Sequence, residues 1–176
     1  MPPSTPLDPA CEPLDPRTFR QVLGQFATGV CVVTARTADG EPVGLTMSSF
    51  NSVSLDPPLV LFSVDRRAHS LPALRSARGF GINILGQGQR ALSDRFARAL
   101  ADKWEQVEHH GGVHDVPLIA GALAHLECVP HAIHDGGDHE IFLARVLRVS
   151  AVGADAPLIF FRGGYHGLAS PDMPQR

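Results

Sequence analysis

The chain has 176 residues, 44% of them apolar and 19% charged, and its 15 basic and 18 acidic side chains give a formal net charge of −3. These values are typical of one globular domain with a buried core and argue against a disordered chain. The absence of a basic excess argues against nucleic-acid binding, and no apolar run is long enough to cross a bilayer.

Residues 1–15 are rich in proline and lack periodicity, so we expect a flexible N-terminal arm, followed by one domain over 16–170 and a tail over 171–176. The arm has neither the basic nor the apolar region of a secretory signal. The three cysteines form no CxxC pair. We therefore expect a cytoplasmic protein with reduced thiols, in which Cys31 and Cys128 are buried in strands.

The first predicted helix is capped by Asp15 and has Pro16 at its first position, where a missing N–H is tolerated. We expect it to end at Gly29. Its apolar residues recur with helical spacing and predict one buried face, made of Phe19, Val22, Leu23 and Phe26.

Further along the chain, runs of β-branched and apolar residues predict seven strands. They are 30–35, 43–54, 59–65, 79–85, 122–133, 139–152 and 158–161. We expect the second and third to form a hairpin with a wide connection at Asp56-Pro57-Pro58.

Two more helices are predicted, a short one over 69–76 and one from Gln89 whose inward side chains are Leu92, Phe96 and Leu100. Residues 101–117 read as a polar excursion on the surface. With few βαβ units, the pattern predicts a mainly β fold with helices, a closed antiparallel β-barrel.

The segment 44–70 carries the chemistry. In one continuous strand its hydroxyl side chains share a face: Thr46, Ser48, Ser52 and Ser54. A solvated sheet edge explains such a row equally well. Arg66 and Ser70 follow on a turn that opens a helix, and a guanidinium, a hydroxyl and helix N–H groups are what a phosphate monoester needs.

This run, GLTMSSFNSVSLDPPLV, resembles the signature of the short-chain flavin reductases, the reductase components of two-component flavin monooxygenases. Four other segments resemble the same family in the same order. They are FRQVLGQFATGVCVVTA at 19–35, FGINIL at 80–85, GGDHEIFLARV at 136–146 and PLIFFRGGYHGL at 157–168.

The resemblance implies an FMN-binding split β-barrel that forms a homodimer, with flavin in a cleft near the dimer interface. It assigns cofactor contacts, many of them through the main chain, to ten residues. They are Thr46, Met47, Ser48, Ser49, Ser52, Phe62, Ser63, Arg66, Ser70 and Asn83. Met47 and Ser48 stand where many relatives have Ala-Asn.

His139, in Gly137-Asp138-His139, resembles the family's nicotinamide-side histidine and is the candidate catalytic residue. Arg162 and Tyr165 are weaker candidates for the cofactor mouth. The implied reaction passes hydride from nicotinamide C4 of NADH or NADPH to N5 of FMN or FAD, and both reactive parts belong to cofactors. The implied partner is an oxygenase that receives diffusible reduced flavin.

Three alternatives remain open. The chain could be a non-enzymatic flavin-binding electron carrier or sensor, or it could reduce a metal complex or corrinoid through a bound flavin. A sister oxidase acting on a phosphorylated vitamin shares the fold, but it would need a basic cluster beyond Arg66-Arg67. A metal site at His110 and His114 is not expected, because Gly111 and Gly112 disfavour a helix there.

Overall fold

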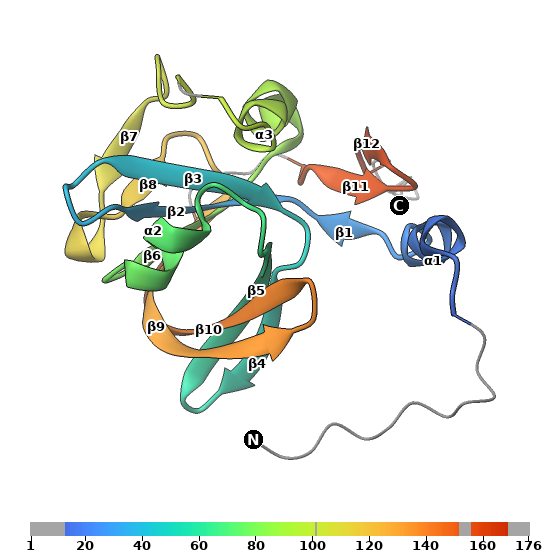
Figure 1. The fold of residues 1–176 in the computed structure, drawn as a ribbon. Coiled ribbons are helices and arrows are strands. Elements are labelled where there is room, and N and C mark those ends of the chain that lie inside the picture. The colour runs from blue at the N-terminus through green and yellow to red at the C-terminus, as the bar shows by residue number, and fades with distance from the viewer. Residues whose placement is uncertain (1–12, 101, 152–155, 169–176) are drawn as a thin grey trace.

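The computed structural model describes residues 13–100, 102–151 and 156–168 (Figure 1). The helices in these ranges are α1 (Pro16–Leu23), α2 (Leu71–Ser76), η1 (Gln87–Gln89), α3 (Arg90–Phe96) and η2 (Val113–Asp115). The strands are β1 (Thr28–Gly29), β2 (Cys31–Arg36), β3 (Pro42–Met47), β4 (Asn51–Leu55), β5 (Pro58–Asp65), β6 (Phe80–Ile84), β7 (His109–Gly111), β8 (Pro117–Ile119), β9 (Ala124–Gly136), β10 (His139–Ala151), β11 (Ile159–Phe161) and β12 (Gly164–His166). Most of the expected arm, including Cys11, and the expected tail 171–176 lie outside the described residues.

Seven strands form one antiparallel sheet in the order β3-β2-β6-β9-β10-β5-β4. Figure 1 shows the sheet curling round, with β2 and β3 in its upper part and β4, β9 and β10 in its lower part. The edge strands β3 and β4 do not pair with each other, so the barrel is open along that seam. The expected mainly β barrel with helices is confirmed, and it is split, as the family resemblance implied, and not closed, as the strand pattern predicted.

The core is built from the inward side chains of the central strands. Phe62 on β5 stacks on Phe142 on β10 with ring centroids 5.2 Å apart, and Phe80 on β6 meets both rings edge-on. Such pairs stabilise a core beyond the area they bury. Cys31 and Cys128 are free and buried in strands, as predicted. Burial raises the pKa of each thiol to about 12, so both are neutral.

The predicted strand 43–54 is wrong, because the chain leaves the sheet after Met47 and starts a new strand at Asn51. β3 pairs only with β2, whereas β4 pairs with β5 at the opposite edge of the sheet. The hydroxyl side chains of this run therefore do not form one continuous row. Nor is the hairpin connection wide, since Leu55 pairs with Pro58 across a two-residue turn.

Residues 101–117 were expected to lie on the surface, and this prediction is wrong for the end of the segment. β7 and β8 form a two-stranded sheet, and Val116, Pro117, Leu118 and Ile119 are buried. The helix before it also ends earlier than predicted. α3 stops at Phe96, and Leu100 is exposed and does not point into the core.

α1 begins as predicted, because the Asp15 carboxylate accepts a 2.9 Å hydrogen bond from the main-chain N–H of Thr18. It ends at Leu23, before the predicted Gly29. Its apolar face is not buried against the described residues: Phe19, Val22, Leu23 and Phe26 are all exposed. In Figure 1 α1 lies beside β1, away from the seven-stranded sheet. None of the described helices is long and apolar enough to cross a membrane.

Candidate functional site

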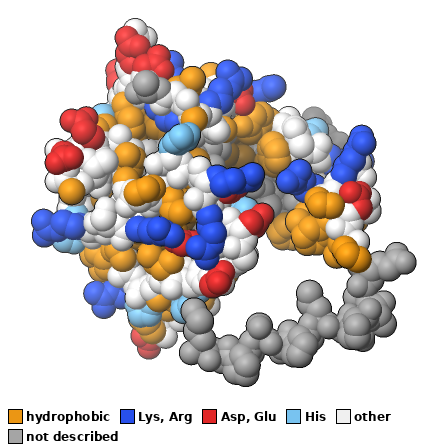
Figure 2. Space-filling model, in the orientation of Figure 1, with side chains coloured by type: hydrophobic (Ala, Val, Ile, Leu, Met, Phe, Trp, Pro, Cys, Tyr) orange, Lys and Arg blue, Asp and Glu red, His pale blue; other side chains and the backbone are white. Residues whose placement is uncertain are grey.

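A groove runs between β3, the end of β5 with the loop 66–70 before α2, and the described residues 97–100, 103 and 104 after α3. It consists of two adjoining cavities of about 400 Å³ and about 410 Å³. Four residues line both: His69, Ser70, Ala99 and Lys103. We call this feature the basic groove, because its second cavity is also lined by Arg67 and Arg98. Figure 2 shows several basic side chains over α2 and the end of β3, on one face of the molecule.

The position of α3 against β3 gives the groove its shape. A Cβ atom at Gly44 would come within 2.6 Å of the Phe96 ring, so only glycine allows this close approach. The Thr46 hydroxyl donates to the main-chain carbonyl of Ser93 at 2.7 Å. These contacts hold α3 on the edge strand, and the segment that follows α3 forms the groove wall.

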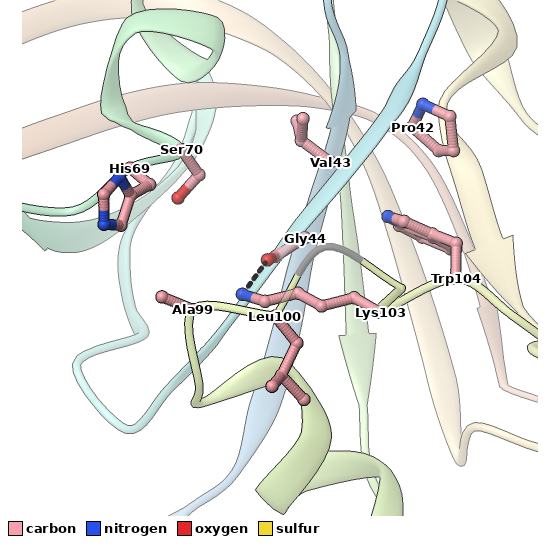
Figure 3. A pocket seen from close by; sticks show the side chains of 9 residues that line it. All are labelled: Pro42, Val43, Gly44, His69, Ser70, Ala99, Leu100, Lys103 and Trp104. Atoms are coloured by element: carbon pink, nitrogen blue, oxygen red, sulfur yellow. Dashed lines mark hydrogen bonds between the residues drawn. The ribbon is translucent and has the colours of Figure 1, made fainter.

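The first cavity has aromatic and apolar walls. Figure 3 shows Trp104 and His69 on opposite sides of it, with Val43 between them. Trp104 packs edge-on against Phe96 and against His109, with ring centroids 4.9 Å and 5.0 Å apart. A planar ring system with a charged tail suits this combination of an apolar wall and nearby cations.

Charges in the second cavity are mainly positive. Arg67 forms an ion pair with Asp65 at 2.7 Å, and hydrogen bonds from Arg67 hold the pKa of that carboxyl well below its usual range. Lys103 Nζ donates to the carbonyls of Phe96 at 3.3 Å and Gly44 at 3.5 Å. Burial lowers the pKa of Lys103. Lys103 and Arg98 would suit an anionic ligand, and phosphate is the anion that nucleotide cofactors carry.

Among the residues predicted from sequence, Ser70 lines the groove directly, and its side chain makes no capping hydrogen bond to α2. His139 lies close to one end, because it pairs with Asp65 in the register of β10 and β5. Its Nδ1 lies 2.6 Å from an oxygen of Asp138. Ser70 is thus available to a ligand, and His139 is near enough to contact one that extends past Asp65.

Several predicted hydroxyls lie outside the groove. Ser49 Oγ both donates to the Ser63 carbonyl at 3.2 Å and accepts from the Ser63 N–H at 3.0 Å, which ties the β3–β4 connection to β5. Ser48 and Ser52 are exposed, near and on β4 respectively. None of these four serines lines either cavity, and their flavin contacts stay a prediction.

Three of the predicted cofactor residues have buried side chains, and their contacts to flavin stay a prediction that concerns the main chain. Met47 and Phe62 belong to the apolar core. Asn83 is fully buried and satisfied: its Nδ2 donates to the Val32 carbonyl at 2.9 Å, and its Oδ1 accepts from the Ile119 N–H at 2.7 Å. Asn83 therefore fastens β8 to the sheet. Only the main chain of these residues could meet a ligand.

Arg66 was expected to bind a phosphate, but its guanidinium is occupied by the protein itself. It donates to the Gly137 carbonyl at 2.8 Å, to Glu140 at 2.9 Å and to Asp135 at 3.1 Å. These bonds fasten the end of β5 to the β9–β10 hairpin. The neighbouring Arg67, and not Arg66, lines the groove. The partners of the two side chains differ, since the β9–β10 hairpin binds Arg66 and Asp65 binds Arg67.

Arg162 and Tyr165 do not reach the basic groove. Arg162 donates to Oε1 of Gln25 and lies over the Phe161 ring, in a separate cavity beside α1. The Tyr165 hydroxyl lies 2.8 Å from Ser93 Oγ, and its ring packs against Phe160. Tyr165 thus has a structural role on the inner side of α3, and the expected place of both residues at the cofactor mouth is not supported.

The sequence interpretation missed several residues that line the groove, among them Arg67, His69, Arg98, Lys103 and Trp104. Lys103 and Trp104 fall in the segment 101–117 that was expected to be a polar excursion on the surface. The single Trp and the single Lys of the chain, adjacent at 103 and 104, were a usable signal. The described ranges contain no group of three or more His, Cys, Asp or Glu side chains that could hold a metal ion.

Comparison with known proteins identifies relatives along nearly the whole chain. Residues 23–169 match the model of the family described as flavin reductase like domain. The flavin-dependent monooxygenase reductase subunit HsaB of Rhodococcus jostii is 40% identical over 163 residues, which is 93% of this chain and 83% of that protein. The FMN reductase (NADH) SmoA of Agrobacterium fabrum is 45% identical over 157 residues, 88% of this chain and 86% of that protein.

A solved structure agrees with the fold. The NADH:FAD oxidoreductase SgcE6 of Streptomyces globisporus, solved in complex with NAD and FAD fragments, superimposes with a TM-score of 0.83. It is 39% identical, and the match covers 92% of this chain and 99% of that chain. The family match over residues 23–169 includes the seven-stranded sheet and the residues that line the basic groove.

Proposed function

This chain belongs to the flavin reductase-like domain family, and we propose that it uses NADH to reduce a flavin bound in the basic groove. It is a flavin oxidoreductase that serves as the reductase component of a two-component monooxygenase. The observation that carries the proposal is the family match over 23–169, because that range contains the whole barrel and the groove.

The residues of the groove fit a flavin nucleotide. An apolar wall formed by Val43 and Trp104 suits a planar ring, and Lys103, Arg98 and the free Ser70 hydroxyl suit its phosphate. Bound flavin and nicotinamide would supply the hydride acceptor and donor themselves. The protein must hold the flavin and nicotinamide rings in contact and exclude orientations in which hydride transfer does not occur. No nucleophile or dedicated base is needed, which agrees with a groove walled by main chain, cations and aromatic rings.

NADH is the proposed electron donor, and both FMN and FAD are proposed acceptors. The printed names of SmoA and SgcE6 each specify NADH, and they specify FMN and FAD respectively. The deciding assay follows oxidation of NADH and of NADPH, each with riboflavin, FMN and FAD. We expect a higher kcat/KM with NADH than with NADPH. We also expect both FMN and FAD to be reduced. A preference for NADPH would contradict the donor assignment.

Delivery of free reduced flavin is the second part of the proposal. An open groove suits a ligand that leaves within a catalytic cycle, whereas an electron carrier needs tight retention. Reduced flavin produced in a stopped-flow experiment should be trapped by a separately purified flavin-dependent oxygenase. The delivery model is wrong if the flavin stays with the protein through gel filtration and none reaches the oxygenase. The protein would then be an electron carrier, or it would reduce a docked metal complex or corrinoid.

We further propose that the protein is a homodimer in the cytoplasm, where NADH is available. The support is the exposed apolar surface around α1, where Val22 is 64% and Phe26 75% exposed in the single chain. Figure 2 shows hydrophobic side chains on this side of the molecule. Exposed patches of this kind mark interaction sites. Light scattering should give twice the chain mass of 18.8 kDa. Val22→Asp, which places a charge on this surface, should lower the measured mass toward that of the monomer.

A further inference from the structure

A cavity lies at the end of the barrel that is far from α1. The turn between β2 and β3, the end of α2 with the residues that lead into β6, and η2 form its walls, and Figure 1 shows the β2–β3 turn on the left and α1 on the right. Its volume is about 390 Å³, and its lining includes Arg36, Thr37, Ser76, Arg78 and His114. We call it the distal cavity. It shares no lining residue with the basic groove.

Side chains that can carry positive charge dominate the distal cavity, although the chain as a whole has a net charge of −3. Arg36, Arg78 and His114 line it, and no carboxylate does so among the described residues. Asp115 pairs with Arg36 at 2.8 Å, but its side chain is 70% exposed and lies outside the lining. Arg78 forms no ion pair within the described ranges. The cavity therefore keeps an excess of positive charge and suits an anionic ligand.

Hydrogen-bond donors in the cavity are fixed in place and remain partly unused. Arg36 Nε donates to the Asp115 carbonyl at 2.7 Å and Nη1 to the Gly40 carbonyl at 2.8 Å, whereas Nη2 donates to no described residue. The Thr37 hydroxyl accepts from the main-chain N–H of Glu41 at 3.0 Å, which leaves its own proton for another acceptor. A guanidinium held by two bonds loses little further freedom when a ligand binds its third nitrogen.

The wall formed by η2 has an unusual backbone. His114 and Asp115 have φ values of 55° and 58°, in the left-handed region that is uncommon outside glycine. Arg36 holds Asp115 there through both its carbonyl and its carboxylate. A Cβ atom at Gly79 would lie 3.1 Å from Val116 Cγ1, so η2 packs closely on the start of β6. Backbone of this kind persists where surrounding contacts enforce it, often at ligand clamps. Here it brings His114 to the cavity.

We propose that the distal cavity binds the phosphate group of a small organic phosphate through Arg36, Arg78 and His114. A tetrahedral phosphate accepts hydrogen bonds from several sides, and these three side chains come from three separate segments. The volume is larger than a phosphate group needs and falls within the range of small-molecule sites, so it leaves room for the organic part. This site goes beyond the proposed function, because flavin reduction in the basic groove does not use it.

The test is isothermal titration of the wild-type protein with inorganic phosphate, in a buffer that contains no other phosphate. Arg78→Met removes a charged donor, and His114→Asn removes the imidazole while keeping a residue that tolerates the left-handed backbone. The matched control is Arg145→Met, at an exposed arginine on β10 that lines neither the distal cavity nor the groove. Lys103→Met reports on phosphate bound in the basic groove. Circular dichroism establishes that each variant is folded.

We expect Arg78→Met to weaken phosphate binding at one site by about 10-fold to 100-fold and His114→Asn by about 3-fold to 10-fold, the usual sizes for a charged and a neutral donor. Arg145→Met should bind phosphate like wild type. Reduction of riboflavin by NADH should be unchanged in Arg78→Met, which separates this site from the reaction. Wild-type protein that binds no phosphate would overturn the proposal. So would phosphate binding that Lys103→Met abolishes and Arg78→Met leaves intact, because the anion would then lie in the groove.

Two further titrations identify the kind of anion. Glycerol 3-phosphate should bind at least as tightly as inorganic phosphate, and Arg78→Met should weaken both to the same extent. Acetate should bind more weakly than phosphate, because a planar monoanion reaches fewer of the donors. A site that takes inorganic phosphate and excludes glycerol 3-phosphate, or that prefers acetate, would refute the assignment to an organic phosphate.

Discussion

The Thr46 hydroxyl on β3 donates a 2.7 Å hydrogen bond to the main-chain carbonyl of Ser93 inside α3. Ser93 is fully buried, and its own hydroxyl lies 2.8 Å from that of Tyr165 on β12. This pair of bonds joins the edge strand, the helix and the small C-terminal sheet. Residues 97–100 continue directly from α3 and line the groove, so the position of this groove wall depends on the two bonds.

Replacing Thr46 with Val should remove the hydrogen bond and preserve the shape of the side chain. We expect the free energy of unfolding to fall by about 1 kcal/mol, a typical value for one hydrogen bond, and flavin binding to weaken as α3 shifts. Urea denaturation measures the first effect and fluorescence titration the second. Thr46→Ser, which keeps the hydroxyl, is the control. A Val variant as stable as wild type would show that the bond contributes nothing to holding α3.

Phe62 should affect stability and not ligand recognition, because its ring is buried against Phe142 and Phe80. Phe62→Ala is expected to lower the free energy of unfolding by about 3–5 kcal/mol. The milder Phe62→Leu should remain folded and bind riboflavin with an unchanged dissociation constant. If Phe62→Leu unfolds like wild type but binds flavin weakly, the sequence-based assignment of Phe62 to the flavin would be correct after all.

Acid should destabilise the protein in part through Glu140, a carboxylate that is only 5% exposed on β10. A hydrogen bond from Arg75, with the charges of Arg75 and Arg66, holds the pKa of Glu140 below its usual value of 4.5. Because the folded pKa is the lower one, this contribution is present above about pH 4.5 and is lost as the pH falls through the depressed value. Unfolding midpoints measured between pH 3 and pH 7 should therefore fall less steeply for Glu140→Gln than for wild type. The exposed Glu108 supplies the control, and Glu108→Gln should follow the wild-type curve.

His139→Ala should raise the apparent KM for NADH and leave the riboflavin dissociation constant nearly unchanged. The reason is its position opposite Asp65 at one end of the groove, where its imidazole can donate to a second ligand. Steady-state kinetics at saturating FMN measure the change, with His131→Ala on β9 as the comparison. A variant that loses flavin but keeps its KM for NADH would place His139 on the flavin side.

Much of the local structure was predictable, because it depends on neighbouring residues. The Asp15 cap, the strand character of 30–35 and the buried cysteines were all correctly predicted. The five segments that resemble the flavin reductases also identified the family, which the match over 23–169 confirms. These inferences need only the order of residue types along the chain.

The site was predicted less well, because pairing partners decide which side chains are free. Arg66 and Arg67 are indistinguishable in the sequence, yet three acceptors on the β9–β10 hairpin occupy Arg66 and leave Arg67 at the groove. Asn83 was predicted to contact a ligand, but its Oδ1 accepts a hydrogen bond from the main-chain N–H of Ile119 on β8. A hydrogen-bonding side chain that the protein itself occupies is not free for a ligand. Which side chains are occupied depends on contacts between residues that are far apart in the sequence.

The amino-acid sequence by itself therefore determined the family, the mainly β fold and the chemistry that the chain must support. Tertiary structure alone decided that β3 and β4 lie at opposite edges of the sheet and that Lys103, in a segment expected on the surface, projects into a groove with Ser70. The physical reason is that secondary structure follows from local periodicity, whereas burial and free hydrogen-bonding groups follow from long-range packing.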